Sequence, residues 1–318
     1  MSQSKNIIDI ASVATPCTFE ENDLIKKILI KNNFEVNFFN ENKVSINAPQ
    51  NHHFASIDPY QRFLNFKEAC ENINSKIIWC NRGGYGSADI LPFLYQMPKP
   101  KNKKILIGFS DIVSIGSFVQ KNWGWKVVCA PMLSQILKDK VSAQSQQIIF
   151  DLINGKIAEL NYDLKLLKGT PSPVESEIVG GCVSVLAGNY ATKNQLDWRN
   201  KILFLEDEGE DGERLERYFT QIAFMINEKK SQPQAILLGN FLEGNEFGNP
   251  QSQKINLAIQ KFCDKINNIA IWQETSNSLG HSFNQKPLIL GIKSKILTNG
   301  KISQKINLSF FSKKLKIK

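Results

Sequence analysis

The sequence predicts an α/β protein of two domains, the first of which carries a parallel sheet. The chain has 318 residues, of which 42% are apolar, and this is enough for two hydrophobic cores of ordinary size. In the first half, short apolar runs alternate with amphipathic helical patterns, and beyond residue 170 this alternation becomes less regular. A proline-bearing stretch at 169–173 separates the halves, so we expect domains at 1–168 and 174–318.

The first domain alternates predicted strands with predicted helices. The strands span 7–13, 34–39, 76–80 and 104–108, and the helices span 22–32, 59–73, 88–94 and 112–121. This rhythm is typical of βαβ units, in which helices cover a parallel sheet. Functional side chains are therefore expected where the carboxyl ends of these strands meet.

The second domain has a mixed pattern. Its predicted strands span 177–179, 201–205, 235–238 and 288–292, and its predicted helices span 212–229 and 254–265. Strands and helices no longer alternate regularly, which indicates a mixed sheet.

The charge of the chain does not indicate a nucleic-acid partner. Lys and Arg exceed Asp and Glu by 39 to 30, a net charge of +9. Although lysines are frequent after residue 286, most stand singly between apolar residues, which is typical of the solvent face of a strand. No basic cluster is combined with aromatic stacking residues.

The sequence also bears on membranes, thiols and metals. No run approaches roughly 18 apolar residues, and the first residues lack a signal-peptide core, so we expect a cytoplasmic protein with no membrane association. The six cysteines include no C-x-x-C pair, and no histidine has a second ligand at a recognisable spacing. Free thiols and no metal site are expected.

A candidate nucleophile lies at the end of the predicted strand 104–108. Gly108 and Ser110 stand where this strand runs into a helix, and a serine on such a turn presents its hydroxyl at the edge of the sheet. The fifth position of the G-x-S-x-G pattern is Ile112, so the match is incomplete. Alternatively, Ser110 or Asp111 caps the helix.

A glycine-rich loop at 82–87 follows the neighbouring predicted strand. Its three glycines allow main-chain N–H groups to approach a ligand closely, either a phosphate or an oxyanion. Because both strands end at one edge of the sheet, this loop and Ser110 are expected to be neighbours. That favours an oxyanion hole over a nucleotide site.

A serine nucleophile needs a base and an acid that orients it. Of the three histidines, His52 and His53 lie in a polar connection, whereas His281 stands at the start of a loop before an apolar strand and is the better candidate. A predicted strand of the second domain ends in two carboxylates, Glu206 and Asp207, and either could orient the imidazole.

Together, these segments resemble the LD-carboxypeptidase family, which includes the microcin C self-immunity peptidases. The matching segments follow the family's order and are 79–87, 107–112, 131–132, 179–181, 202–209, 239–241 and 280–281. The resemblance implies an N-terminal domain like a Rossmann or flavodoxin half-fold and a C-terminal domain with a barrel-like core. It also implies a homodimer that needs no metal or organic cofactor.

The same resemblance implies roles for individual residues. Ser110 is the implied nucleophile, His281 its general base and Glu206 the acid that orients His281. The backbone N–H groups of Gly84 and Asp111 would stabilise the oxyanion.

The implied substrate is an amide between an L-centre and a C-terminal D-amino acid, such as D-alanine of a murein tetrapeptide in cell-wall recycling. Its free carboxylate needs a cation, for which Arg82 is the candidate, together with Gly83 and Tyr85 in the same loop. Arg82 could equally brace the loop.

The sequence departs from the family pattern at two places. Cys129 and Ala130 replace a His-Gly pair, and Cys182 replaces an asparagine, so the exact substrate is open. One alternative is an immunity-type peptidase or amidase that acts on peptide-nucleotide conjugates. Another is a non-catalytic protein that binds a peptide or a phosphate.

Overall fold

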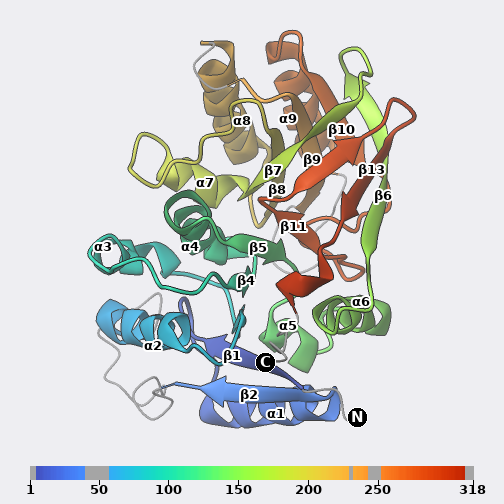
Figure 1. Ribbon diagram of the computed structural model, residues 1–318. Coiled ribbons are helices and arrows are strands. Elements are labelled where there is room, and N and C mark those ends of the chain that lie inside the picture. The colour runs from blue at the N-terminus through green and yellow to red at the C-terminus, as the bar shows by residue number, and fades with distance from the viewer. Residues whose placement is uncertain (1–4, 40–56, 229–231, 243–251, 312–318) are drawn as a thin grey trace. The chain divides into compact units, whose positions relative to one another are not determined.

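The computed structural model describes residues 5–39, 57–228, 232–242 and 252–311 (Figure 1). The chain divides into two compact units, a first unit of residues 1–158 and 307–318 and a second unit of residues 159–306. This division differs from the predicted domains in two respects. The strand at 159–168 belongs to the second unit, and the chain after residue 306 returns to the first.

The first unit contains a parallel sheet with the strand order β5-β4-β3-β1-β2. Its strands are β1 (Asn6–Ala11), β2 (Phe34–Phe38), β3 (Ile77–Cys80), β4 (Ile105–Ile107) and β5 (Lys126–Cys129). All residues of β3 and β4 are buried, as expected for parallel strands with helices on both faces. The predicted βαβ arrangement of this unit is confirmed.

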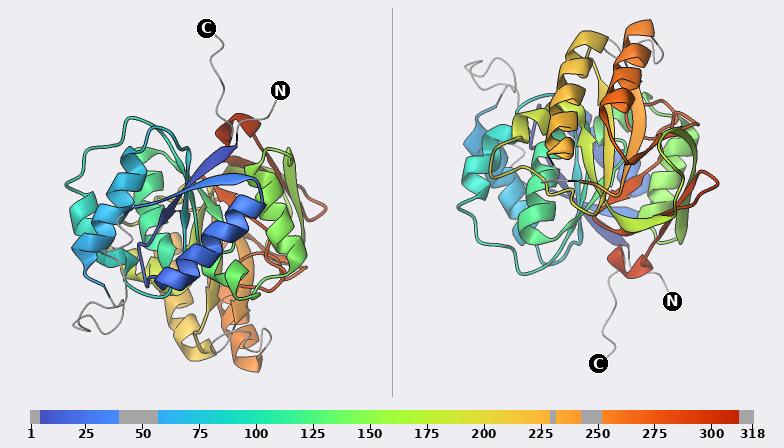
Figure 2. Two further views of the ribbon diagram at one scale, coloured as in Figure 1. Left: turned by 90° about the horizontal axis from the view of Figure 1, so that it is seen from below. Right: turned by 90° about the horizontal axis from the view of Figure 1, so that it is seen from above.

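Helices cover both faces of this sheet. They are α1 (Phe19–Lys31), α2 (Pro59–Glu71), α3 (Leu91–Leu94), α4 (Val113–Phe118), α5 (Leu133–Leu137) and α6 (Ala143–Ile153). Figure 2 shows α2, α3 and α4 on one face and α1, α5 and α6 on the other. A 3₁₀ turn at Ser110–Ile112 precedes α4, and a π-helical turn at Val119–Trp123 follows it.

The sheet of the first unit buries one ion pair. Nζ of Lys104 lies 2.9 Å from Oδ2 of Asp9, and both side chains are fully buried. The other oxygen of Asp9 accepts hydrogen bonds from the amides of Asn37 and Asn72. These contacts satisfy charges that would otherwise be costly to bury.

The second unit is a closed barrel with the strand order β10-β6-β13-β12-β7-β8-β9. Its strands are β6 (Glu159–Lys168), β7 (Val174–Cys182), β8 (Ile202–Glu208), β9 (Ala235–Leu242), β10 (Ala270–Glu274), β12 (Lys293–Ile296) and β13 (Lys301–Lys305). Strands β7, β8, β9 and β10 are parallel in succession, and the other pairings are antiparallel. The barrel-like core implied by the resemblance is confirmed.

Further elements of this unit are β11 (Leu288–Leu290), α7 (Val183–Asn189), α8 (Gly212–Asn227) and α9 (Gln253–Lys265). Helices α8 and α9 lie side by side (Figure 1). Among the described residues, no helix has both the length and the apolar composition needed to cross a bilayer.

Candidate active site

Ser110 stands on a strained turn at the carboxyl end of β4. Its φ is 59°, in the left-handed region that non-glycine residues rarely adopt. A β-carbon added at Gly108 would lie 3.0 Å from Cγ2 of Ile112, so the turn that leads into the helix is tightly packed. In the described chain, neither the 3₁₀ turn nor α4 has a side-chain capping hydrogen bond, so capping does not explain Ser110. Strain of this kind occurs at nucleophile elbows.

The glycine loop lies beside Ser110. Strands β3 and β4 are neighbours, and a β-carbon added at Gly83 would lie 3.6 Å from Cβ of Ser110 and 2.8 Å from Cε of Met132. Gly84 has a φ of +99°, and a β-carbon there would lie 2.6 Å from Oγ1 of Thr15. A side chain is therefore disfavoured at Gly84, whereas at Gly83 the nearest atom is the flexible end of Met132; the backbone of this loop lies close to the serine.

The carboxyl group of Asp111 joins this loop to the elbow. Its Oδ2 accepts a hydrogen bond of 2.8 Å from the backbone N–H of Ser87, and the backbone N–H of Gly86 also donates to this carboxyl. Burial raises the pKa of Asp111, and these hydrogen bonds oppose the rise. From the sequence, Asp111 was expected either to cap the following helix or to donate its backbone N–H to the oxyanion, and its side-chain contact with the glycine loop was not predicted.

Arg62 supports the same loop from α2 and was not predicted. Its guanidinium is fully buried, and Nη1 donates to the carbonyl oxygens of Val13, at 2.9 Å, and Gly86. Nη2 lies 3.1 Å from Oδ2 of Asp89. The sequence feature that could have identified Arg62 is its position within the apolar face of the predicted helix 59–73.

Two other predicted residues of the loop differ in exposure. Arg82 is half-buried. Its charge opposes the rise that burial causes in the pKa of Cys17, and it adds to the lowering of the pKa of Glu21, so Arg82 lies near the start of α1. Tyr85 is 53% exposed, and its backbone N–H donates to Oγ1 of Thr15 at 3.2 Å. The side chain of Tyr85 is therefore largely exposed, whereas Arg82 interacts with groups at the start of α1.

In the second unit, Glu206 and His281 form a buried pair. Oε2 of Glu206 lies 2.7 Å from Nδ1 of His281 and also accepts a hydrogen bond of 3.1 Å from the backbone N–H of His281. Glu206 is fully buried on β8, and His281 is 5% exposed. An imidazole whose Nδ1–H is held in this way presents Nε2 as the nitrogen that can exchange a proton.

The loop before His281 is fixed against β8 and β9. Gly280 has a φ of +90°, and a β-carbon there would lie 2.6 Å from Oε2 of Glu206. The side-chain amide of Asn240, on β9, donates to the carbonyl oxygen of His281 at 3.1 Å, and its backbone N–H donates to that of Leu279. These contacts hold the imidazole at the end of the barrel strands.

Asp207 points elsewhere and caps α7. Its carboxyl accepts a hydrogen bond of 2.7 Å from the backbone N–H of Ser184, and the thiol of Cys182 lies 3.3 Å from its Oδ1. Burial and the nearby charge of Glu206 raise the pKa of Asp207 to about 6. Of the two carboxylates left open by the sequence, Glu206 is the one that contacts His281.

The pKa of His281 is set by opposing influences. Burial lowers it, but Glu206 and the two carboxylates that follow it on β8 raise it, to about 9 from the usual 6.5. These carboxylates therefore favour the protonated form of the imidazole, and its capacity as a base increases as the pH rises.

The two departures from the family pattern are buried thiols. Cys129 ends β5, and Cys182, whose pKa burial raises well above its usual value, contacts the cap of α7. His52 and His53 lie outside the described residues. Within the described chain, no cluster of His, Cys, Asp and Glu is arranged to hold a metal ion.

Ser110, Gly83, Gly84 and Asp111 come together in the first unit. Glu206 and His281 come together in the second. The meeting of Ser110 with His281 stays a prediction.

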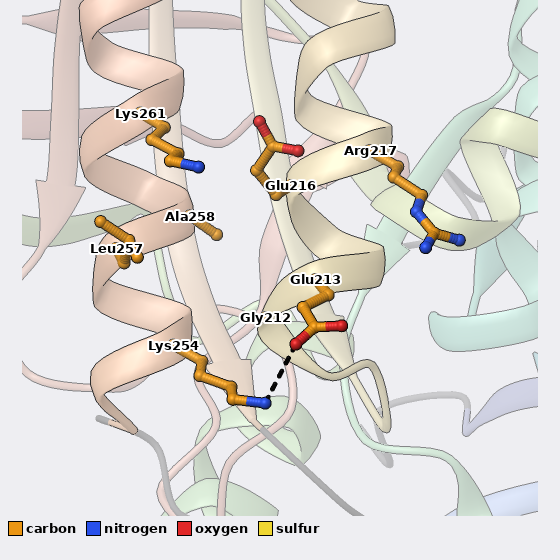
Figure 3. A pocket seen from close by; sticks show the side chains of 8 residues that line it. All are labelled: Gly212, Glu213, Glu216, Arg217, Lys254, Leu257, Ala258 and Lys261. Carbon is orange, nitrogen blue, oxygen red and sulfur yellow. Dashed lines mark hydrogen bonds and ion pairs between the residues drawn. The ribbon is translucent and has the colours of Figure 1, made fainter.

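A separate groove runs between α8 and α9 (Figure 3). It is lined by Gly212, Glu213, Glu216, Arg217, Lys254, Leu257, Ala258 and Lys261. Nζ of Lys254 lies 3.1 Å from Oε1 of Glu213 across it. Its lining mixes charges of both signs and does not include His281.

Known proteins match the chain over both units. Residues 8–130 match the LD-carboxypeptidase N-terminal domain, and residues 175–296 match the LD-carboxypeptidase C-terminal domain. A Rickettsia conorii protein named as a carboxypeptidase is 28% identical over 242 residues, which are 74% of this chain and 72% of that protein. A murein tetrapeptide carboxypeptidase of Pseudomonas aeruginosa is 30% identical over 191 residues, which are 58% of this chain and 61% of that protein.

A solved structure extends the likeness to the fold. An MccF-like protein from Bacillus anthracis matches with a TM-score of 0.75 at 18% identity, over 96% of this chain and 98% of that chain. With both of its domains matched, the chain belongs to the LD-carboxypeptidase family of peptidases.

Proposed function

We propose that this protein is a serine carboxypeptidase that hydrolyses the amide between an L-centre and a C-terminal D-amino acid, such as D-alanine of a murein tetrapeptide. The observation that carries the proposal is the buried Glu206–His281 pair, with 2.7 Å between Oε2 and Nδ1. A histidine held at Nδ1 by a carboxylate is the base that a serine nucleophile requires. The murein tetrapeptide carboxypeptidase among the relatives supports the substrate class.

In the proposed mechanism, Oγ of Ser110 attacks the scissile carbonyl carbon as Nε2 of His281 takes its proton. Glu206 keeps Nδ1 protonated and stabilises the imidazolium that forms. His281 then gives the proton to the leaving amine of the D-amino acid, and water hydrolyses the acyl-enzyme in the same manner. The strained φ of 59° at Ser110 supports this role.

The backbone N–H groups of Gly84 and Asp111 would stabilise the oxyanion, and each such donor is worth about 3 to 4 kcal/mol in comparable sites. The close approach of Gly83 to Ser110 supports this assignment. Arg82 would bind the substrate carboxylate, and the exposed ring of Tyr85 would pack on the peptide.

The proposal extends to the setting of the reaction. A peptide released from murein would reach the enzyme in the cytoplasm during cell-wall recycling, and the active form would be a homodimer. Both points rest on the resemblance to the family.

The proposal is tested by release of D-alanine from a purified murein tetrapeptide. Ser110→Ala and His281→Ala should lower kcat by about four or more orders of magnitude, because each removes a member of the proton-transfer chain. Glu206→Gln should lower it by about four orders, because the wrong imidazole tautomer is then favoured. Ser117→Ala is the matched control, since this buried hydroxyl on α4 has no hydrogen-bond partner in the described chain and lies outside the site.

Other outcomes would contradict parts of the proposal. Activity retained by Ser110→Ala would exclude the serine mechanism. A folded but inactive wild type would exclude the murein substrate. Peptide-nucleotide conjugates would then be tried, because the fold is shared with an MccF-like protein. Binding of peptide without hydrolysis would indicate a non-catalytic protein.

A further inference from the structure

Strand β8 directs two carboxylates at His281. Glu206 and Glu208 are two positions apart, and side chains with this spacing point to the same face of a strand. Oε2 of Glu206 lies 2.7 Å from Nδ1 of His281, and Oε2 of Glu208 lies 3.5 Å from Nε2. The imidazole therefore has a carboxylate at each of its nitrogens.

The two carboxylates differ in burial. The side chain of Glu206 is fully buried and also receives the backbone N–H of His281, so its position is fixed. The side chain of Glu208 is 25% exposed, which leaves it room to change rotamer. The backbone of Glu208 is held independently of its carboxylate, because its N–H donates to Oδ1 of Asp207.

The position of Glu208 matters because Nε2 is the nitrogen that must receive the serine proton. A protonated Nε2 is attracted to the Glu208 carboxylate, whereas a neutral Nε2 would point its lone pair at a negative charge. While Nε2 of His281 carries a proton that points at the Glu208 carboxylate, it cannot accept the proton of the serine.

We propose that Glu208 is a positioning residue that holds Nε2 of the protonated His281 in the free enzyme and must withdraw before His281 can act as the base. This inference rests on the proposed function for its catalytic meaning. Its structural part, the charge interaction between Glu208 and His281, holds with or without that function.

The negative charge of Glu208 raises the pKa of His281. Burial lowers the pKa of His281, whereas Glu206, Glu208 and Asp207, all on β8, raise it. Removing the charge of Glu208 should lower this pKa, by about one unit for a partly exposed carboxylate at this range. Below the pKa, a fall of about one unit increases the neutral fraction roughly tenfold.

The experiment is an NMR titration of the imidazole in the full-length protein, wild type and Glu208→Gln. The chain has only three histidines, so a His281→Asn variant assigns the resonance, and His52 and His53 serve as internal references. Glu213→Gln is the matched control, because Glu213 has a mostly exposed carboxylate that pairs with Lys254.

The expected result is a pKa of His281 that is lower by about one unit in Glu208→Gln and unchanged in the control. A shift of less than about half a unit, or an equal shift in Glu213→Gln, overturns the inference. If the enzyme is active, the acidic limb of kcat/KM should move to lower pH by the same amount. The NMR result is read without any substrate, so its failure is distinct from failure of the proposed function.

Discussion

At Gly280 the backbone passes so close to β8 that a β-carbon would lie 2.6 Å from Oε2 and 2.7 Å from Cβ of Glu206. The residue also has a φ of +90°, which L-residues rarely adopt. Two independent constraints thus require glycine immediately before His281. The short backbone approach is what allows Oε2 of Glu206 to bind both the N–H and Nδ1 of His281.

Gly280→Ala should therefore separate Glu206 from His281 and lower kcat/KM by about 100-fold or more, since a displacement near 1 Å in a catalytic group has this effect. The matched control is Gly124→Ala, where φ is +66° but no atom lies within 4 Å of the added carbon. It should lose about 1 to 2 kcal/mol of stability through strain and keep its activity. Equal activity of the two variants would show that the approach of Gly280 to Glu206 is unimportant. The measurements are steady-state kinetics and urea denaturation.

Some residues of the candidate site could be proposed from the sequence because they follow short apolar strands. Ser110 and Glu206 are of this kind. The local pattern left Glu206 and Asp207 open, and only the family resemblance implied Glu206. The choice depends on which face of β8 each side chain occupies, and the pairing with β9 is irregular between Leu205 and Asp207. The side-chain role of Arg62 depends on packing between distant segments, which a local pattern does not contain.

Capping contacts show how single side chains fix whole elements. Asp207, on strand β8, accepts a hydrogen bond from the N-terminal turn of α7. Asp211 is the residue directly before α8 and caps it, with Oδ1 accepting a hydrogen bond of 2.8 Å from the backbone N–H of Arg214. Asp207 is 2% exposed, whereas Asp211 lies at the surface. The two carboxylates therefore make similar hydrogen bonds in different surroundings.

Asp207→Ala should cost about 2 to 3 kcal/mol of unfolding free energy, because buried donors lose their acceptor. Asp211→Ala should cost about 1 kcal/mol, since water can replace the exposed cap. Chemical denaturation of both variants at one pH measures the difference. An Asp207→Ala loss no larger than that of Asp211→Ala would mean that α7 does not depend on this contact.

The same elements show which boundaries the sequence could predict. The first helix was predicted from residue 22, yet α1 begins at Phe19 because Thr18 and Glu21 form a capping box, a T-x-x-E signal that was overlooked. Strand β6 was not predicted, although its residues alternate between exposed and buried along its first half. It lies directly before the proline-bearing stretch that was interpreted as a linker.

At the scale of the whole chain, the order of the strands in the barrel could not be predicted. Its closure requires β13 to pair with β6, in the register Ile302 to Tyr162, and local periodicity contains no information on such distant partners. The parallel sheet of the first unit was predictable because its strands are linked by short βαβ connections of fixed handedness. The barrel was expected only through the resemblance to a family.

The chain also returns to the first unit after the barrel is complete. Phe311 is 1% exposed and borders a small cavity together with Ile7 and Ile77, and Nζ of Lys76 donates to the carbonyl oxygen of Ser309 at 3.2 Å. The first unit therefore contains strands from the start of the chain and a core residue from its last described segment.

Phe311→Ala should lower the stability of the first unit by about 3 to 5 kcal/mol, the usual cost of removing a buried phenylalanine. Hydrogen exchange followed by mass spectrometry should show the loss in β1 and β3. Leu308→Ala is the matched control, because its side chain is 39% exposed and should cost less than about 1 kcal/mol. If exchange in β1 and β3 were the same in Phe311→Ala as in the wild type, the returning segment would not be part of the core. Because the returning segment follows the barrel in the chain, the first unit cannot reach full stability until the barrel residues have been synthesised. The first unit would then not finish folding before the second, although its synthesis begins first.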